Sequence, residues 1–121
     1  MTTQTKSKPK KRASKKAIAL NPWQPTQDPI ELAILGKFVE ELNECSAIAA
    51  RCIIQGLNEC EPVTKVPNRS ALIDEMGDVI ATMIMAVNHY DLPLEEINAR
   101  KSRKECHLEK WHKLIKKEPI K

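Results

Sequence analysis

The stretch from residue 69 to residue 90 constrains the fold most, because its apolar side chains recur with helical spacing on two faces. One face carries Leu72, Met76, Val79, Met83 and Val87, and the other carries Ile73, Ile80 and Ile84. A helix that is apolar on two faces is normally buried between neighbouring helices. The helices of one chain of 121 residues are too few to cover both faces. We therefore expect an all-α helical bundle that is completed by oligomerisation.

The stretch between Asp28 and Gly56 also favours a helix. Asp28 suits the N-cap, Pro29 suits the first helical position, and Gly56 is a typical terminator. The apolar stripe between them has alternating spacings of three and four, and it consists of Leu35, Phe38, Leu42, Cys45, Ala49 and Cys52. This spacing predicts a helix-packing seam. Aromatic residues make up only 3% of the chain and just three glycines are present, which also fits an all-helical fold.

Together these elements predict one helical domain over residues 28–116. The helix over residues 69–90 is expected to be capped near Asn68 or Ser70. A short turn follows, and a third helix is expected over about residues 94–115.

The two ends of the chain differ from this domain. Residues 1–16 carry seven basic residues and no acidic one, whereas the rest of the chain has 16 acidic residues against 13 basic ones. We expect a disordered basic tail, which serves either to solubilise the protein or to tether it to nucleic acid, or as a nuclear-import address in a eukaryote. Residues 17–27 are expected to form an extended arm in which Trp23 packs on the following helix. Residues 117–121 are expected to fray.

The cysteines and the hydropathy pattern bear on location. The four cysteines show no Cys-x-x-Cys spacing, and no apolar run has the length of a membrane span or the features of a secretion signal. We expect a reduced protein of the cytoplasm without a membrane partner.

Two pairs of acidic residues are the strongest functional signal. Glu41 and Glu44 lie three apart in the first helix, and Glu75 and Asp78 lie three apart in the second. Carboxylates at this spacing share one helix face and repel each other. Chance explains a Glu pair readily, but an unpaired Asp in an apolar helix is rare. The four side chains are therefore candidate metal-binding and catalytic residues for Mg²⁺ or Mn²⁺, with more than one ion per site.

The third helix carries a polar and basic stripe of Asn98, Lys101 and Lys104. A metal site that handles a triphosphate needs cations for the distal phosphates, so these residues are candidate phosphate ligands. The alternative is a solvated helix face.

The sequence offers two other sets of candidate metal ligands, and each set is incomplete. Glu109 and His112 form one Glu-x-x-His, whereas di-iron bundles need two copies. Cys106, His107 and His112 could bind zinc, but a second ligand pair with zinc spacing is missing from the sequence.

The order of these motifs resembles the MazG-like all-α nucleoside triphosphate pyrophosphohydrolases. The resemblance covers about residues 30–111 and rests on Glu41-x-x-Glu44, on Glu75-x-x-Asp78 and on the Asn- and Lys-bearing third helix. It implies a metal-dependent hydrolase that cleaves a nucleoside triphosphate between the α and β phosphates, giving a monophosphate and pyrophosphate. It further implies a homodimer or homotetramer with substrate held between subunits. Bacteriophage members that act on dGTP or dATP are similar in size, and for a phage-encoded chain of this kind we expect the host cytoplasm as the location.

A different class of function stays open from the residues alone. The protein could be a non-catalytic helical binding module, with the acidic residues as a partner surface and the basic tail as a nucleic-acid tether.

Overall fold

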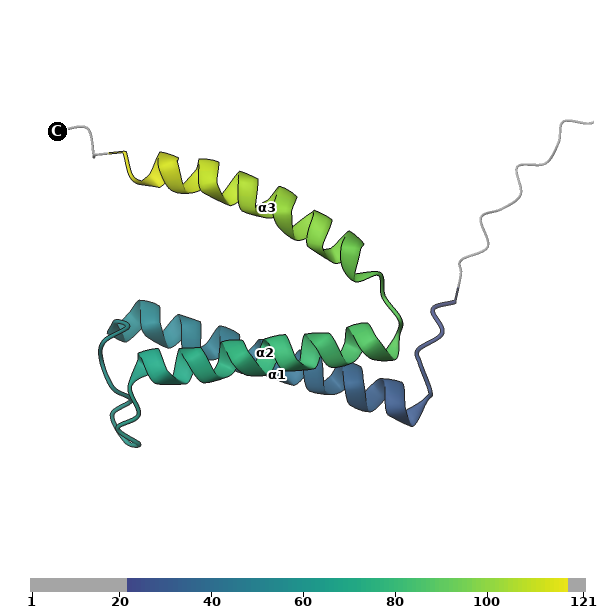
Figure 1. Cartoon of the computed structure of the whole chain (residues 1–121). Helices are drawn as coiled ribbons and strands as arrows, with labels where there is room; N and C mark the ends of the chain where they lie inside the picture. The colour runs from purple at the N-terminus through teal and green to yellow at the C-terminus, as the bar shows by residue number, and fades with distance from the viewer. Residues whose placement is uncertain (1–21, 118–121) are drawn as a thin grey trace, which may run out of the picture.

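The computed structural model describes residues 22–117, and these residues form three α-helices (Figure 1). Helix α1 spans Pro29–Gln55, α2 spans Asn68–His89 and α3 spans Leu94–Ile115. Within this range the only β-type pairing is an isolated bridge between Cys60 and Pro67. The prediction of an all-α fold is confirmed for these residues. The expected basic tail lies outside the described residues, as do residues 17–21 of the expected arm and nearly all of the frayed end.

Helix α1 begins and ends where its local sequence predicts. The Asp28 carboxylate accepts hydrogen bonds from the backbone N–H of Ile30 at 2.8 Å and of Glu31 at 3.4 Å, which satisfies two of the free N–H groups at the helix start. At the other end Gly56 has a φ of 100° and its N–H donates to the Cys52 carbonyl. A side chain at this φ would be strained, so the glycine terminates the helix.

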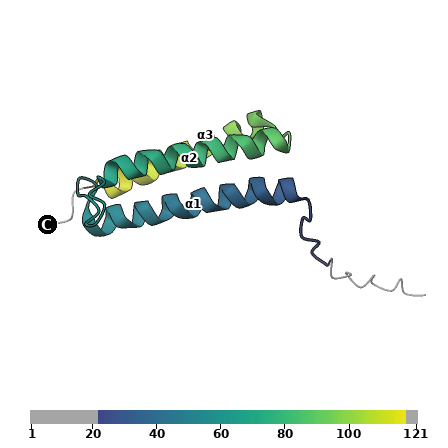
Figure 2. The same ribbon diagram turned by 90° about the horizontal axis from the view of Figure 1, so that it is seen from below.

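Helices α1 and α2 form an antiparallel hairpin and lie side by side along most of their length (Figures 1 and 2). The connecting loop is held by Asn68, whose side chain is fully buried. The Asn68 amide donates to Gln55 Oε1 at 3.1 Å and to the Gly56 carbonyl at 3.0 Å, and its backbone N–H donates to the Glu59 carbonyl. A cap for α2 was expected near Asn68 or Ser70, but the N-cap is Pro67 and no described side chain caps the helix. Asn68 is the first residue of α2, and its side chain fastens the loop to the end of α1 instead.

The seam between α1 and α2 contains two acidic residues. On α1 the more buried positions alternate by four and three, and they are Ile34, Phe38, Glu41, Cys45, Ile48 and Cys52. On α2 they include Leu72, Glu75, Val79, Thr82 and Ala86. Glu41 and Glu75 therefore occupy places that apolar residues would take in an ordinary helix-packing seam. Leu42, which was expected in the α1 stripe, is instead exposed.

Helix α3 leaves the hairpin after a turn at Asp91 and runs apart from it (Figure 1). None of its residues is buried. Leu108, Trp111 and Ile115, which were expected on an inner side, are all exposed. The arm before α1 also lacks the expected packing, because Trp23 is 94% exposed.

Apolar surface remains open on the hairpin as well. Exposed large side chains on α1 and α2 include Leu35, Val39, Leu42, Ile73, Met76 and Ile80. Among the helices of residues 22–117, none combines the length and the hydropathy that a membrane span requires.

Candidate metal centre

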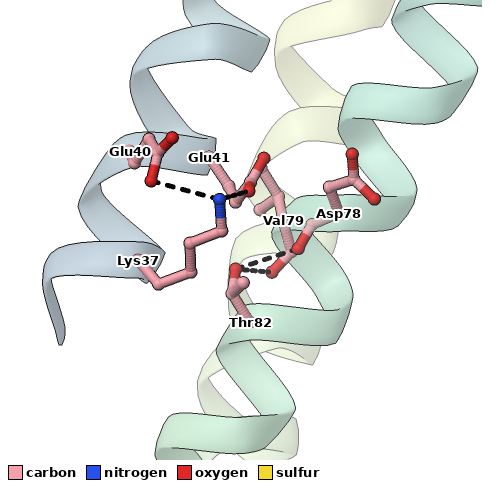
Figure 3. A network of polar contacts seen from close by, with 6 residues as sticks. All are labelled: Lys37, Glu40, Glu41, Asp78, Val79 and Thr82. Carbon is pink, nitrogen blue, oxygen red and sulfur yellow. Dashed lines mark hydrogen bonds and ion pairs between the residues drawn. The ribbon is translucent and has the colours of Figure 1, made fainter. Parts of the chain in front are cut away.

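Three carboxylates from the two hairpin helices meet at the seam. Glu41 on α1 and Glu75 and Asp78 on α2 each offer one oxygen, and these oxygens lie within 4.8 Å of one another. The spacing of three places Glu75 and Asp78 on one face of α2, and the antiparallel packing brings Glu41 opposite them. In Figure 3 the side chain of Glu41 extends from α1 toward α2, the helix that carries Asp78. Carboxylate oxygens in such a group are suitable ligands for a hard divalent cation.

Burial makes the group costly without a cation. Glu41 is only 6% exposed, and its Oε2 atom has no hydrogen-bond partner among the described residues. Glu75 Oε2 is buried and without a partner in the same way. A buried carboxylate oxygen with no partner loses its hydration and gains nothing in return. A cation between the two glutamates would compensate for this loss.

The electrostatics of Glu75 point in the same direction. Burial is the main cause that raises the pKa of Glu75 above its ordinary value of 4.5, and the negative charges of Glu44, Asp78, Glu41 and Asp74 add to it. The site therefore has a strongly negative potential that favours either a proton or a metal ion.

One cation of the chain already reaches the group. Lys37 Nζ lies 2.8 Å from Glu41 Oε1 and 3.1 Å from Glu40 Oε2, so the ammonium group bridges the two carboxylates (Figure 3). Its hydrogen bond to Glu41, followed by that to Glu40, raises the pKa of Lys37. Sequence reasoning missed Lys37, although its spacing of three and four to Glu40 and Glu41 is the usual signal of a helical ion pair.

The fourth predicted carboxylate, Glu44, lies outside the three-carboxylate group. It is exposed, one helical turn after Glu41. Its charge still contributes to the raised pKa of Glu75, so it is close enough to interact with the site electrostatically.

The predicted phosphate ligands are not brought to the carboxylates within one chain. Asn98, Lys101 and Lys104 are exposed on α3, and Lys101 forms an ion pair with Glu105 on the same helix. The hairpin alone therefore supplies acidic groups and Lys37, whereas the basic stripe lies on a helix that runs apart from it.

The sequence offered two alternative metal sites, and the described residues assemble neither. Across residues 22–117 the only group of three or more potential ligands is Glu41, Glu75 and Asp78. Glu109 is paired with Lys113, and Cys106 is a free, exposed thiol.

Comparison with known proteins adds no functional information, so a functional conclusion rests on the residues described above. No protein-family model, no curated protein and no solved structure matches the chain.

Proposed function

We propose that the protein is a metal-dependent hydrolase of nucleoside triphosphates. The observation that carries this proposal is the pair of buried, unpartnered oxygens, Glu41 Oε2 and Glu75 Oε2, within one group of three carboxylates. Glu41, Glu75 and Asp78 would bind Mg²⁺ or Mn²⁺, and exposed Glu44 is available as a ligand of a second ion. The resemblance of the acidic motifs to those of MazG-like enzymes selects the reaction among the many that such a site could perform.

The proposed reaction is attack of water on the α phosphorus. Bound metal would neutralise the phosphate oxygens and lower the pKa of water. One of the glutamates accepts the proton from this water as the new oxygen–phosphorus bond forms. The bond between the α phosphorus and its bridging oxygen breaks, and pyrophosphate leaves with the electron pair. The products are a nucleoside monophosphate and pyrophosphate, and dGTP and dATP are the first substrates to test.

The phosphate ligands would come from a neighbouring subunit. Asn98, Lys101 and Lys104 do not approach the carboxylates of their own chain, and the apolar faces of α1 and α2 remain open. A homodimer or homotetramer would cover these faces and place α3 of one copy near the site of another. Light scattering should give at least twice the chain mass of 13.7 kDa at micromolar concentration. A monomer would contradict this assembly.

The function is tested by incubating the full chain with a panel of triphosphates and Mg²⁺ or Mn²⁺, and by resolving the products. Monophosphate and pyrophosphate are expected, without a diphosphate intermediate, and a chelator should stop the reaction. Release of orthophosphate and a diphosphate would show that water attacks a different phosphorus.

A non-catalytic binding module remains the second candidate, since the open apolar surface of the hairpin would also suit a protein partner. Absence of turnover with every triphosphate, together with a monomeric chain, would favour that function. The basic tail would then be the candidate tether to nucleic acid.

A further inference from the structure

Lys37 contacts Glu41 of the proposed metal site, and this contact affects how tightly the site binds a metal ion. Lys37 Nζ bonds to Glu41 Oε1 at 2.8 Å, and Glu41 is the most buried of the three carboxylates. Glu41 Oε2 has no hydrogen-bond partner in the part of the chain that the structure describes, so a divalent cation could bind there while Lys37 stays on Oε1. The two cations would then neutralise the same negative charge and repel each other at short range, so each weakens the binding of the other.

Lys37 also has a second acceptor at hand. Its Nζ lies 3.1 Å from Glu40 Oε2, and the side chains of Lys37 and Glu40 are 51% and 53% exposed, whereas that of Glu41 is 7% exposed. The lysine therefore reaches the site from solvent, and a small rotation would leave it paired with Glu40 alone. Glu40 is next to Glu41 in the chain but is exposed and lies outside the carboxylate group.

We propose that Lys37 is a displaceable internal counter-ion of the metal site. In the metal-free protein its ammonium group compensates the buried Glu41 charge. When a divalent cation binds, Lys37 transfers to Glu40 and releases Glu41 to the metal. This inference rests on the proposed metal site and adds a regulation to it: the lysine stabilises the empty site and lowers its affinity for metal.

The decisive variant is Lys37→Met, which keeps the aliphatic part of the side chain and removes the competing charge. Isothermal titration of the chelator-treated full chain with Mn²⁺ should give binding at least about tenfold tighter than wild type. The metal-free variant should melt lower, because the Glu41 charge loses its partner. Lys113→Met is the matched control: it also removes an ammonium group from an i,i+4 ion pair, but on α3. Its Mn²⁺ affinity should equal that of wild type.

General loss of positive charge would also tighten metal binding, so a double-mutant cycle separates the two causes. Glu40→Gln removes the second acceptor and should weaken Mn²⁺ binding, since Lys37 then stays on Glu41. In the Lys37→Met background the same Glu40→Gln change should have little effect. Equal effects in both backgrounds would overturn the transfer of Lys37 to Glu40.

A second substitution at Lys37 changes the side chain but keeps its positive charge. Lys37→Arg retains the charge and can bond a carboxylate with two N–H groups, so it should bind Mn²⁺ no more tightly than wild type. Weaker or unchanged binding in Lys37→Met, with wild type binding Mn²⁺ normally, would overturn this inference and leave the metal site standing. If wild type itself binds no Mn²⁺, both the site and the inference are wrong.

Discussion

The α1–α2 hairpin and helix α3 are both α-helical, but they differ in the side-chain contacts that hold them in place. In the hairpin, side chains of two helices meet along a seam, and Asn68 is fully buried against the end of α1. On α3 nothing is buried, and the ion pairs Lys101–Glu105 and Lys113–Glu109 link residues of the same helix. Exposed pairs of this kind contribute little to stability. The candidate metal ligands thus belong to a unit defined by its own contacts, whereas α3 has almost no contacts with the other described helices.

The largest effect should come from the hairpin. Asp78→Asn keeps the shape of an exposed side chain while removing a charge from the carboxylate group. We expect turnover to fall by about 100-fold or more, roughly 3 kcal/mol of barrier, with the fold retained. Steady-state kinetics and circular dichroism measure the two quantities.

The control for this change is Asp74→Asn, which removes the same charge from an exposed neighbour on the same helix that lies outside the group. It should stay within a few-fold of wild type by the ordinary size of surface charge effects. Near-wild-type turnover of Asp78→Asn would show that the carboxylate site is wrong.

The next effect tests whether α3 acts across subunits. The double change Lys101→Ala and Lys104→Ala should raise KM by about tenfold or more by removing phosphate contacts, and should leave Mn²⁺ affinity unchanged. This variant and Asp78→Asn should then restore activity when they are mixed as exchanging subunits, because one site of each mixed dimer has both parts intact. For a dimer the expected recovery is roughly a quarter of wild type.

The outcome of mixing distinguishes two arrangements of the molecule. If α3 instead folded back on its own hairpin, every site in a mixed dimer would keep one defect. Mixing would then restore nothing, and the separation of hairpin and α3 would have no functional meaning.

A smaller effect concerns stability and pH in the hairpin. Because burial and neighbouring carboxylates raise the pKa of Glu75 above 4.5, the folded protein binds this proton more tightly than the unfolded chain. The metal-free protein should therefore gain stability as the pH falls through the folded pKa of Glu75 toward 4.5, and lose it as the pH rises through that pKa.

Glu75→Gln should melt above wild type at pH 7 without metal and should show a flatter profile over this range. Hydrogen bonds from Thr64 and Val63 lower the pKa of Glu61 to about 2. The stabilising effect of Glu61 is therefore lost only below about pH 4.5, so this residue does not contribute to a change at higher pH. Calorimetry with and without Mg²⁺ would check both statements, since metal should reverse the trend by requiring the ionised carboxylate. A metal-free melting temperature that falls steadily as the pH is lowered from 7 to 4.5, in wild type and variant alike, would contradict the role of Glu75.

The smallest effect should come from outside both regions. Deleting residues 1–16 removes seven basic residues but no apolar pattern that could dock on the domain. Turnover with free nucleotide should stay within about tenfold of wild type, which corresponds to 1.4 kcal/mol. A greater loss would make the basic tail part of the site and would leave the hairpin incomplete by itself.

Features that depend on neighbouring residues along the chain were determined by the sequence alone. Asp28, Pro29 and Gly56 set the bounds of α1 through hydrogen bonds and dihedral angles within a few residues. The spacing of three between Glu75 and Asp78 placed them on one face of α2, because 3.6 residues per turn is a property of any α-helix.

Features that depend on how two helices are placed were decided only in the tertiary structure. The rotation of α1 about its axis brings Glu41 into the seam and leaves Glu44 and Leu42 exposed. The same rotation lets Lys37 reach a buried carboxylate. Asn68 serves the loop and not the helix cap, because the end of α1 lies within reach of its amide. The separate course of α3 has the same physical basis: side-chain contacts between helices depend on their relative position, and periodicity along one helix does not specify which surface another helix will meet.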